Sequence, residues 1–361
     1  MLNRLYVASS KVVLVALAAL VLLGAALASF PGFDDQVVVG VANIDRLVEN
    51  LPPLKVPSVP LPTVLTDDQG HVFATLSSQD RIEVPLSKIS PWVITGLVSA
   101  EDRSFFTNDG IDARGIARAL VNNLLGQPVE GGSTLTQQYV KNLTELATGK
   151  APSASLLRKL HEVVYARQLT ASMTKRQILD GYLNTVYFGA GAWGIQAASQ
   201  RYFSKPASDL SLPEAALLVA LVRSPDYYNP LANPISATKA RNRVLSMMVT
   251  NQALSQADAS QATAAPLGLN PSPLPSYGCA VSSLPLFCQW VTNSLLSLPE
   301  LGATRADRQA ALDAGGLTIT TTLDPTDQQA AEAAATSRVA VTDRVGTAVV
   351  SITPGLSLIH I

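Results

Sequence analysis

Hydrophobic residues are spread unevenly along the chain, and their longest run lies near the N-terminus. Residues 12–30 are all apolar or small, with no charged side chain among them. At about 1.5 Å per residue, a helix of this length spans about 28 Å, close to the ~30 Å hydrocarbon core of a bilayer. Arg4 and Lys11 precede the run, and Asp34 and Asp35 follow it. This pattern predicts a transmembrane anchor.

The flanking charges also predict the orientation of the anchor. Because basic residues stay on the cytoplasmic side, residues 1–11 are expected in the cytoplasm and everything after residue 30 outside. Ala26, Leu27 and Ala28 resemble the small-residue site at which signal peptides are cleaved, so a removed signal peptide is the alternative. Both interpretations export the remainder of the chain.

Beyond the anchor the pattern changes from extended to helical. Residues 52–62 are rich in proline, which indicates an extended spacer. Residues 64–84 alternate weakly around turn residues at 67–70, which predicts two short strands. From residue 89 to about residue 251 apolar residues recur at helical spacing, which predicts a mainly α domain. Three stripes carry this signal: Ile116, Leu120, Leu124 and Leu125; Ile178, Leu179, Tyr182, Leu183 and Val186; Leu217, Leu218, Leu221 and Val222.

The C-terminal part of the chain is more mixed. Residues 266–285 are rich in turn formers and indicate a linker. Residues 317–323 are typical of a strand, residues 327–338 of an alanine-rich helix, and residues 347–352 begin another strand. The last residues continue neither pattern, so we expect a chain that stops within a longer protein.

Composition narrows the class of protein. Of the 361 residues 47% are hydrophobic and only 15% are charged, which excludes a disordered chain. The net charge of −1 provides no basic field to hold nucleic acid. Two cysteines and three histidines are too few for a disulfide framework or a zinc cluster. In an oxidising compartment Cys279 and Cys288 could form one bridge, and two unpaired thiols are the alternative.

The first candidate for chemistry is the sequence Glu101-Asp102-Arg103, which follows an apolar helix predicted over residues 94–100. A carboxylate delivered by the end of such a helix suits a general base. The alternative is a surface Glu-Asp-Arg that is merely followed by a turn.

The second candidate begins with Gly131 and Gly132. Ser133 is expected to cap the helix that follows, whose free N–H groups and positive dipole end would suit a diphosphate. Gln137 and Lys141 are four residues apart and are predicted to share one helix face. An ordinary capped helix after a glycine turn is the alternative.

The third candidate is a charged helix that contains Arg158, Lys159 and Glu162. Their spacings of four and three residues predict ion pairs on one face. In a cleft these groups could stabilise an anionic leaving group, whereas on an exposed helix they would form only a surface salt bridge. His161 and Glu162 begin like a zinc-protease motif, but Tyr165 occupies the position of the second histidine, which excludes that site.

Taken in order, these segments resemble the family-51 peptidoglycan glycosyltransferases, the N-terminal module of class A penicillin-binding proteins. The resemblance covers about residues 65–250. It includes two further segments, residues 178–184, which otherwise look like core packing, and residues 211–230. A single preceding anchor fits as well, because the family's substrate is a membrane lipid.

The chain departs from the family pattern at three positions. Asn108 stands where the family usually has His, Asp180 where it usually has Glu, and Thr170 where Glu is common. Both glutamates that the family uses in catalysis have counterparts here, at Glu101 and Glu162.

The resemblance implies a mainly α fold, in which a lysozyme-like glycosyltransferase domain follows an N-terminal transmembrane helix and precedes a partial C-terminal α+β linker. We interpret the chain as the front half of a class A penicillin-binding protein, cut short before its transpeptidase domain. The expected divisions are a cytoplasmic tail at 1–11, the anchor at 12–30, a spacer at 31–64, the glycosyltransferase domain at 65–250, a linker at 251–314 and the start of the next linker at 315–361.

The resemblance also implies the reaction, which is polymerisation of lipid II with inversion and release of undecaprenyl pyrophosphate. Glu101 would be the general base for the acceptor hydroxyl. Glu162 would organise cations near the leaving diphosphate, either basic side chains or a divalent ion such as magnesium or manganese. The same resemblance implies that the substrate-binding residues are Asp102, Arg118, Ser133, Thr134, Gln137, Gln138, Lys141, Arg158 and Lys159.

The expected partners are lipid II, the nascent glycan strand, the cytoplasmic membrane and other cell-wall synthesis or division proteins, but not nucleic acid. The catalytic domain is expected outside a bacterial cytoplasmic membrane. One alternative is a lysozyme-like lytic muramidase that uses Glu101 as an acid, although it would not need residues 132–138 and 158–162. The other is an inactive, membrane-tethered cell-wall scaffold, against which the presence of both glutamates argues.

Overall fold

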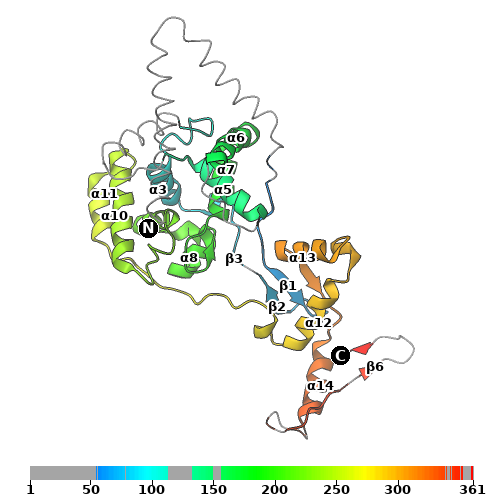
Figure 1. Cartoon of the computed structure of the whole chain (residues 1–361). Helices are drawn as coiled ribbons and strands as arrows, with labels where there is room; N and C mark the ends of the chain where they lie inside the picture. Colours follow the sequence, from blue (N-terminus) through cyan, green and yellow to red (C-terminus); the bar gives the residue numbers. More distant parts are fainter. Residues whose placement is uncertain are drawn as a thin grey trace, which may run out of the picture. The chain divides into compact units, whose positions relative to one another are not determined.

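The computed structural model describes residues 54, 56–77, 79–112, 132–148, 156–337, 339, 342, 344–349, 351–352 and 359–360. The predicted anchor, the first apolar stripe and Arg118 lie outside the described residues. Within the described part of the chain, no helix is long and apolar enough to cross a bilayer. The chain divides into two compact units, one formed by Met1–Pro57 and Ile82–Ser272 and the other by Ser58–Arg81 and Pro273–Ile361 (Figure 1).

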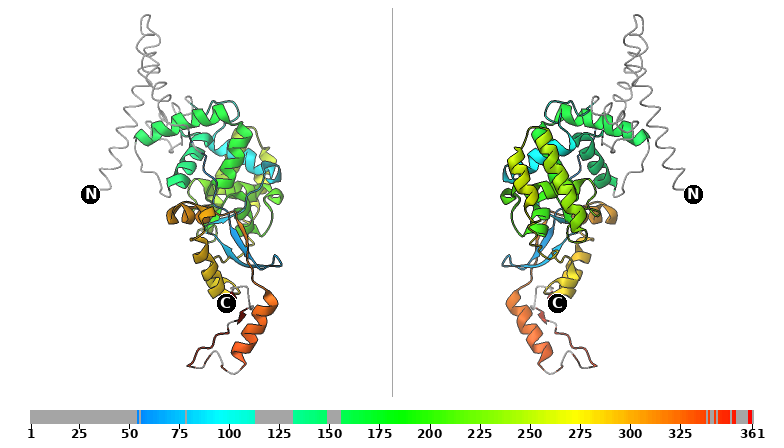
Figure 2. Two further views of the ribbon diagram at one scale, coloured as in Figure 1. Left: turned by 90° about the vertical axis from the view of Figure 1, so that its right-hand side faces the viewer. Right: turned by 90° about the vertical axis from the view of Figure 1, so that its left-hand side faces the viewer.

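The first unit is built almost entirely from helices, which confirms the mainly α prediction (Figures 1 and 2). Its described elements are η1 (Leu86–Lys88), α3 (Pro91–Glu101), α5 (Leu135–Thr148), α6 (Leu156–Ser172), α7 (Lys175–Thr185), β4 (Ala192–Trp193), α8 (Ile195–Phe203), η2 (Ala207–Asp209), α9 (Leu212–Val222), α10 (Pro234–Thr250) and α11 (Gln256–Ala264).

Helix α9 lies in the core of the first unit. It is apolar on all sides, and every residue from Ala215 to Leu221 is buried, as expected for a helix without a polar face. Ser211 and Glu214 form a capping box at its start. Helices α3 and α10 pack against α9 and against each other. These three helices form one packing group, and α3 delivers Glu101 at its C-terminal end.

Helices α5, α6 and α7 form a second packing group. The predicted stripe on α7 is confirmed, because Ile178, Leu179, Tyr182 and Leu183 are each at most 1% exposed. Gly181 allows α7 to approach α5 closely, since a Cβ atom there would lie 2.2 Å from the hydroxyl of Tyr139. The close approach brings Tyr182 of α7 within hydrogen-bond distance of α5.

Arg241 is a buried cation that closes the C-terminal end of α11. Its guanidinium donates to the carbonyl oxygens of Thr263 at 2.9 Å, Ala265 at 2.8 Å and Pro266 at 3.2 Å. These carbonyls belong to the last turn of α11 and the residues after it, where helices lack internal donors. Burial lowers the pKa of Arg241.

Replacing Arg241 by Met should lower the free energy of unfolding by about 3 kcal/mol, because three carbonyls at the end of α11 lose a charged donor while the apolar stem is kept. Urea denaturation measures the change. Lys239→Met, at an exposed position on the same helix, is the control and should change the free energy by less than about 0.5 kcal/mol. An equally small change at Arg241 would contradict the capping role.

The second unit contains a three-stranded sheet in the order β2–β1–β5. Strand β1 (Thr63–Thr66) pairs antiparallel with β2 (Val72–Leu76) and parallel with β5 (Thr318–Thr320). Its core joins Leu65 and Ala74 of the sheet to Cys288, Val291 and Leu295 of α12. The remaining described elements are β3 (Asp80–Arg81), η3 (Cys279–Val281), α12 (Pro285–Leu295), η4 (Pro299–Leu301), α13 (Arg305–Ala314), α14 (Pro325–Thr336), β6 (Ser351–Ile352) and β7 (Ile359–His360).

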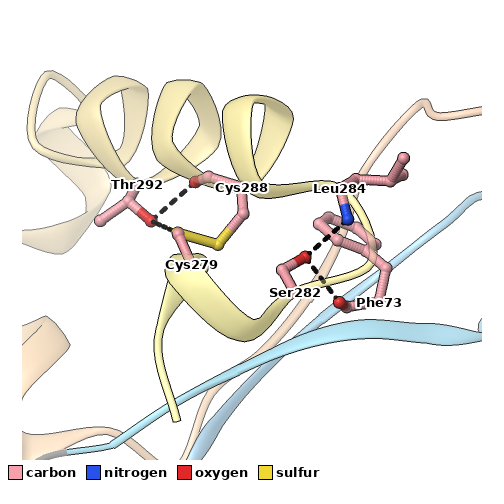
Figure 3. Close-up of a disulfide and its surroundings, with 6 residues drawn as sticks. All are labelled: Phe73, Cys279, Ser282, Leu284, Cys288 and Thr292. Atoms are coloured by element: carbon pink, nitrogen blue, oxygen red, sulfur yellow. Dashed lines mark hydrogen bonds between the residues drawn. A yellow bond between two sulfur atoms is a disulfide. The ribbon is translucent and has the colours of Figure 1, made fainter. Parts of the chain in front are cut away.

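A disulfide joins Cys279 of η3 to Cys288 of α12 (Figure 3). Of the two alternatives left by the sequence, the structure therefore has the bridge. Next to it, the hydroxyl of Ser282 donates to the carbonyl of Phe73 at 2.8 Å and accepts from the N–H of Leu284 at 3.0 Å. The bridge and this serine hold the η3 segment to the start of α12 and to strand β2.

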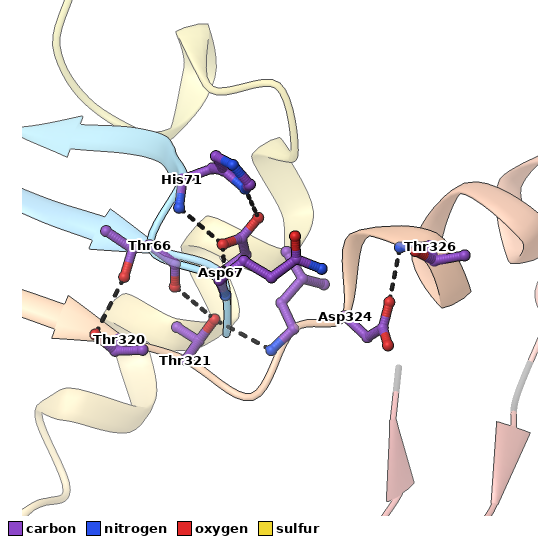
Figure 4. A network of polar contacts seen from close by, with 9 residues as sticks. Thr66, Asp67, His71, Thr320, Thr321, Asp324 and Thr326 are labelled. Atoms are coloured by element: carbon purple, nitrogen blue, oxygen red, sulfur yellow. Dashed lines mark hydrogen bonds and ion pairs between the residues drawn. The ribbon is translucent and has the colours of Figure 1, made fainter.

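The turn between β1 and β2 is organised by Asp67 (Figure 4). One of its carboxylate oxygens accepts from the N–H groups of Gln69 at 2.9 Å and His71 at 2.8 Å, and the other lies 3.1 Å from the His71 ring. Beside it, the N–H and hydroxyl of Thr321 both donate to the carbonyl of Thr66. The predicted turn between β1 and β2 therefore lies beside the residue that follows strand β5.

The unit boundaries differ from those expected from the sequence. The hairpin at residues 63–76 was expected at the start of the glycosyltransferase domain, but it belongs to the second unit because β1 pairs with β5. Residues 251–272 were expected in a linker, but they belong to the first unit, where Arg241 holds the end of α11. Both differences arise from contacts between residues far apart in the sequence.

Candidate active site

Glu101 is the last residue of α3, and its side chain is half-buried. The core residues Val93 and Leu97 hold the helix in place and are not exposed at all. The amide nitrogen of Gln138 on α5 donates to Glu101 Oε2 at 2.8 Å. Oε1 of Glu101 accepts no hydrogen bond from the described residues. The carboxylate is thus held by one oxygen, and the other is available to a ligand.

The amide of Gln138 is itself oriented by Tyr182 of α7, whose hydroxyl donates to Gln138 Oε1 at 2.8 Å. Burial, and secondly the charge of Glu101, raise the pKa of Tyr182 well above its usual value. The phenol therefore remains a neutral donor. Because Gln138 must accept this bond with its oxygen, its nitrogen is directed at Glu101.

Glu101 opens into a cavity of about 250 Å³ within the first unit. The α3–α9–α10 group contributes the residues around Glu101 and residues of α10 to the lining of this cavity. The α5–α6–α7 group contributes the residues just before α5. The lining comprises Ser99, Ala100, Glu101, Asp102, Arg103, Asp112, Gly132, Ser133, Thr134, Arg223, Arg243, Met247, Thr250 and Asn251.

The carboxylate of Asp102 forms hydrogen bonds with other residues of the chain. It accepts from the N–H of Leu135 at 3.1 Å, from Asn108 Nδ2 at 3.1 Å to each oxygen, and from Ser104. Burial raises the pKa of Asp102, and these hydrogen bonds oppose the rise. Lys175 on α7 donates to Asn108 Oδ1 at 2.8 Å. Asp102 therefore fixes the loop after α3 to the start of α5.

The same loop is held by Gly110 and Thr134. The hydroxyl of Thr134 donates to the carbonyl of Gly110 at 2.7 Å. Gly110 has a φ of +96°, and a Cβ atom there would lie 2.5 Å from the carbonyl oxygen of Ala166 on α6. Only glycine suits both this backbone conformation and this approach. The loop that follows Glu101 is consequently in contact with both α5 and α6.

The cap of α5 differs from the expected one. Thr134, not Ser133, caps the helix, because Thr134 N donates to Gln137 Oε1 at 2.9 Å and Gln137 N donates to Thr134 Oγ1 at 3.2 Å. Gln137 is only 3% exposed, whereas Lys141 is exposed. Gln137 and Lys141 lie four residues apart on α5, as predicted, but the capping bond turns the Gln137 side chain inward while Lys141 is exposed.

The predicted charged cluster on α6 is present. Glu162 pairs with Arg158 through Oε1 and with Lys159 through Oε2, the latter at 2.7 Å. The Glu162 side chain is 5% exposed, against 22% for Arg158 and 45% for Lys159. The carboxylate therefore lies beneath its two cations, which solvent can reach.

Lys159 connects this cluster to the cavity of Glu101. Its Nζ donates to the hydroxyl of Ser133 at 2.9 Å, and Ser133 lines the cavity. The structure thus brings together Glu101, Gln138, Ser133 and the three charged residues of α6. Lys141 makes no side-chain hydrogen bond or ion pair within the described residues and is not joined to the cluster.

The site does not fit a metal held by the protein. Both oxygens of Glu162 are bound to cationic side chains. Within the described residues, no group of three or more His, Cys, Asp or Glu side chains could hold a metal ion. The charge near Ser133 is supplied by Lys159 and Arg158.

Two arginines of the cavity, Arg223 and Arg243, are not among the site residues predicted from the sequence. Arg223 follows the end of α9, and Arg243 lies on α10. Arg243, Met247 and Thr250 are spaced by four and three residues, so a helical wheel places them on one face. The sequence shows this spacing, but no neighbouring residues indicate that this face of α10 lies next to Glu101.

Comparison with known proteins identifies the family. A family model described as "Transglycosylase" matches residues 69–249, about half of the chain. The chain belongs to the transglycosylase family. The family resemblance predicted from the ordered motifs, and with it the class of enzyme, is thereby confirmed.

Several transglycosylase relatives are penicillin-binding proteins. The chain is 38% identical over 273 residues to penicillin-binding protein 1A of Mycobacterium tuberculosis, covering 75% of this chain and 32% of that protein. It is 36% identical over 269 residues to penicillin-binding protein 1B of Escherichia coli, covering 73% and 30%. The chain thus spans about a third of the length of these relatives.

A solved structure is also similar. The crystal structure of penicillin-binding protein 1A from Haemophilus influenzae matches with a TM-score of 0.37 and 19% sequence identity. The match covers 67% of this chain and 25% of that one.

Proposed function

We propose that this transglycosylase is a peptidoglycan glycosyltransferase that polymerises lipid II into glycan strands. The observation that carries the proposal is the single cavity that contains both Glu101 and Ser133, where Ser133 binds Lys159 of the Arg158–Lys159–Glu162 cluster. A base and a cationic group thus reach one cavity from different helices. Transfer from a diphosphate donor requires both.

Glu101 acts as the general base. The 4-hydroxyl of the acceptor GlcNAc has a pKa far above neutrality, so its proton must be taken up as it attacks. Gln138 holds Oε2 of Glu101, and Oε1 receives the proton. The oxygen of the hydroxyl bonds to the anomeric carbon of the donor MurNAc, the bond from that carbon to the diphosphate breaks, and configuration inverts.

The charged cluster on α6 stabilises the leaving group. Undecaprenyl pyrophosphate departs as a stable anion, so it needs positive charge more than it needs a proton. Lys159, placed at the cavity by Ser133, and Arg158 supply that charge. Glu162 holds the two cations together from below.

The other predicted residues divide into two groups. Asp102 and Thr134 use their side chains to join the loop after α3 to the start of α5, and Gln137 caps that helix, so we assign all three to the shape of the cavity. Ser133 would hold the donor directly. Arg118 and Lys141 remain candidates for donor binding through the family resemblance.

The site is placed at the outer face of the cytoplasmic membrane. The apolar run at residues 12–30 and its basic flank support this location. Lipid II and the glycan strand are then the substrates, and other cell-wall synthesis or division proteins are the expected partners.

The test is incubation of the detergent-solubilised chain with fluorescent lipid II, followed by separation of the products by length. Glycan polymer that a muramidase digests supports the proposal. Cleavage of preformed glycan without polymerisation would identify the lytic alternative. Neither product, from a chain that is folded by circular dichroism, would favour the inactive scaffold.

A further inference from the structure

Arginines from α9 and α10 reach the cavity of Glu101, and they belong to a different packing group from the residues proposed to bind the leaving group. Arg243 on α10 and Arg223 after α9 are exposed and line this cavity. Both come from the α3–α9–α10 group. Ser133, just before α5, and Lys159, on α6, come from the second group.

The stereochemistry of the reaction separates these two sets of cations. In an inverting displacement the attacking hydroxyl and the departing diphosphate lie on opposite sides of the anomeric carbon. If Lys159 and Arg158 hold the departing group, the acceptor must reach Glu101 from another part of the cavity. The remaining cationic lining is provided by Arg103, Arg223 and Arg243.

The acceptor also needs cations of its own. A lipid-linked acceptor keeps its diphosphate throughout the reaction and carries carboxylates on its stem peptide, so it brings oxyanions near Glu101. Guanidinium groups pair with phosphate and carboxylate through two parallel hydrogen bonds, which fixes orientation as well as charge. An acceptor held in this way would present its 4-hydroxyl to the base in one orientation.

A second cavity of about 500 Å³ shares part of its lining with the first. The two share Ser99, Arg103, Thr250 and Asn251 in their linings. Arg103 is held at this boundary, because its guanidinium donates to Asn251 Oδ1 at 3.1 Å and Asn251 Nδ2 donates to the carbonyl of Ser99 at 2.8 Å. Arg103 therefore lines both cavities, whereas Arg223 and Arg243 line only the cavity of Glu101.

We infer that Arg243, together with Arg223, binds an oxyanion of the acceptor substrate and so orients its hydroxyl toward Glu101. This inference rests on the proposed function. The oxyanion belongs either to the acceptor's diphosphate or to its stem peptide. Arg243 acts on the acceptor alone, whereas Lys159 acts on the donor.

The test uses the full chain in detergent and measures the initial rate at which the first acceptor unit is joined to a labelled donor. The donor is a fluorescent lipid-linked tetrasaccharide whose terminal 4-hydroxyl is blocked, so that it cannot act as acceptor, and unlabelled lipid II is the acceptor. For Arg243→Ala at saturating donor, we expect the KM for acceptor to rise about 10-fold, as for loss of one charged hydrogen bond. The KM for donor should stay within about 2-fold of the original value.

Two variants and two acceptor analogues complete the test. Arg243→Lys should recover most of the acceptor affinity, and Lys239→Ala, one turn earlier on α10 and outside both cavities, should change neither KM. One analogue lacks the stem peptide, and the other replaces the diphosphate by an uncharged linker. If the original chain and Arg243→Ala have equal KM values for one analogue, the group that this analogue lacks is the oxyanion that Arg243 binds.

Several results would overturn the inference while leaving the proposed function intact. These are an unchanged KM for acceptor in Arg243→Ala, an equal rise for donor and acceptor, or a difference that persists with both analogues. Failure of the proposed function is distinct, because the original chain would then form no coupled product. Equal melting temperatures for Arg243→Ala and Lys239→Ala exclude misfolding as the cause of a changed KM.

Discussion

Glu101→Gln is expected to lower the rate of lipid II polymerisation by about 10³-fold while the chain stays folded. The amide has nearly the same shape as the carboxylate, and its oxygen still accepts the hydrogen bond that Gln138 donates at 2.8 Å. It does not accept a proton at neutral pH, however, so the acceptor hydroxyl loses its base. General-base contributions of about 10²–10⁴-fold set the size of the loss.

The measurement is the initial rate of polymer formation, with the urea midpoint as a check on folding. Glu145→Gln is the matched control, because it makes the same chemical change on α5 at a residue that does not line the cavity. It should keep the original rate. If Glu101→Gln polymerises lipid II at that rate too, Glu101 is not the base, and the role must pass to another group in the cavity.

Glu162→Gln should reduce kcat/KM for lipid II by about 10²-fold and change stability by less than about 1 kcal/mol. The carboxylate beneath Arg158 and Lys159 directs both cations, and Lys159 also binds Ser133 at the cavity. Without its negative charge the two cations repel each other, and the positive charge at the leaving group is displaced. Loss of one group that stabilises developing charge typically costs about 10²–10³-fold in rate.

Stability should change little because solvent reaches both cations, with 22% of Arg158 and 45% of Lys159 exposed. When the buried carboxylate loses its charge the two cations stay hydrated, so no unpaired charge is left buried. Glu214→Gln is the matched control, since it breaks an ion pair of 2.6 Å with Lys205 in the same unit but outside both cavities. It should leave kcat/KM unchanged. If the two variants lost activity equally, or if Glu162→Gln lost only stability, the cluster on α6 would be structural.

The local features of the site followed from sequence because they depend on backbone periodicity. Arg158, Lys159 and Glu162 meet since residues three and four apart lie on one helix face. The apolar stripe on α7 and the buried α9 followed for the same reason. The order of the motifs was enough to predict the family. The capping role of Gln137 was not predicted, because Ser133 was the expected cap of α5.

Other features depended on contacts between distant segments. Gln138 reaches Glu101 across 37 positions, and Lys159 reaches Ser133 across 26. Arg223 and Arg243 line the cavity only because α9 and α10 pack against α3. The hairpin at residues 63–76 belongs to the second unit because β1 pairs with β5. Across this pair the hydroxyls of Thr66 and Thr320, 254 positions apart in the sequence, are hydrogen-bonded.

The sequence alone determined the apolar stripes of α7 and α9, which charges pair along a helix and to which family the chain belongs, since each depends on residues within a few turns or on the order of motifs. The tertiary structure alone decided which cations share a cavity with Glu101, which oxygen of that carboxylate is held, that Cys279 and Cys288 are bridged, and where the two units divide. Those outcomes depend on how helices and strands pack over long separations, and such packing is set by the shapes of whole surfaces and not by any local pattern.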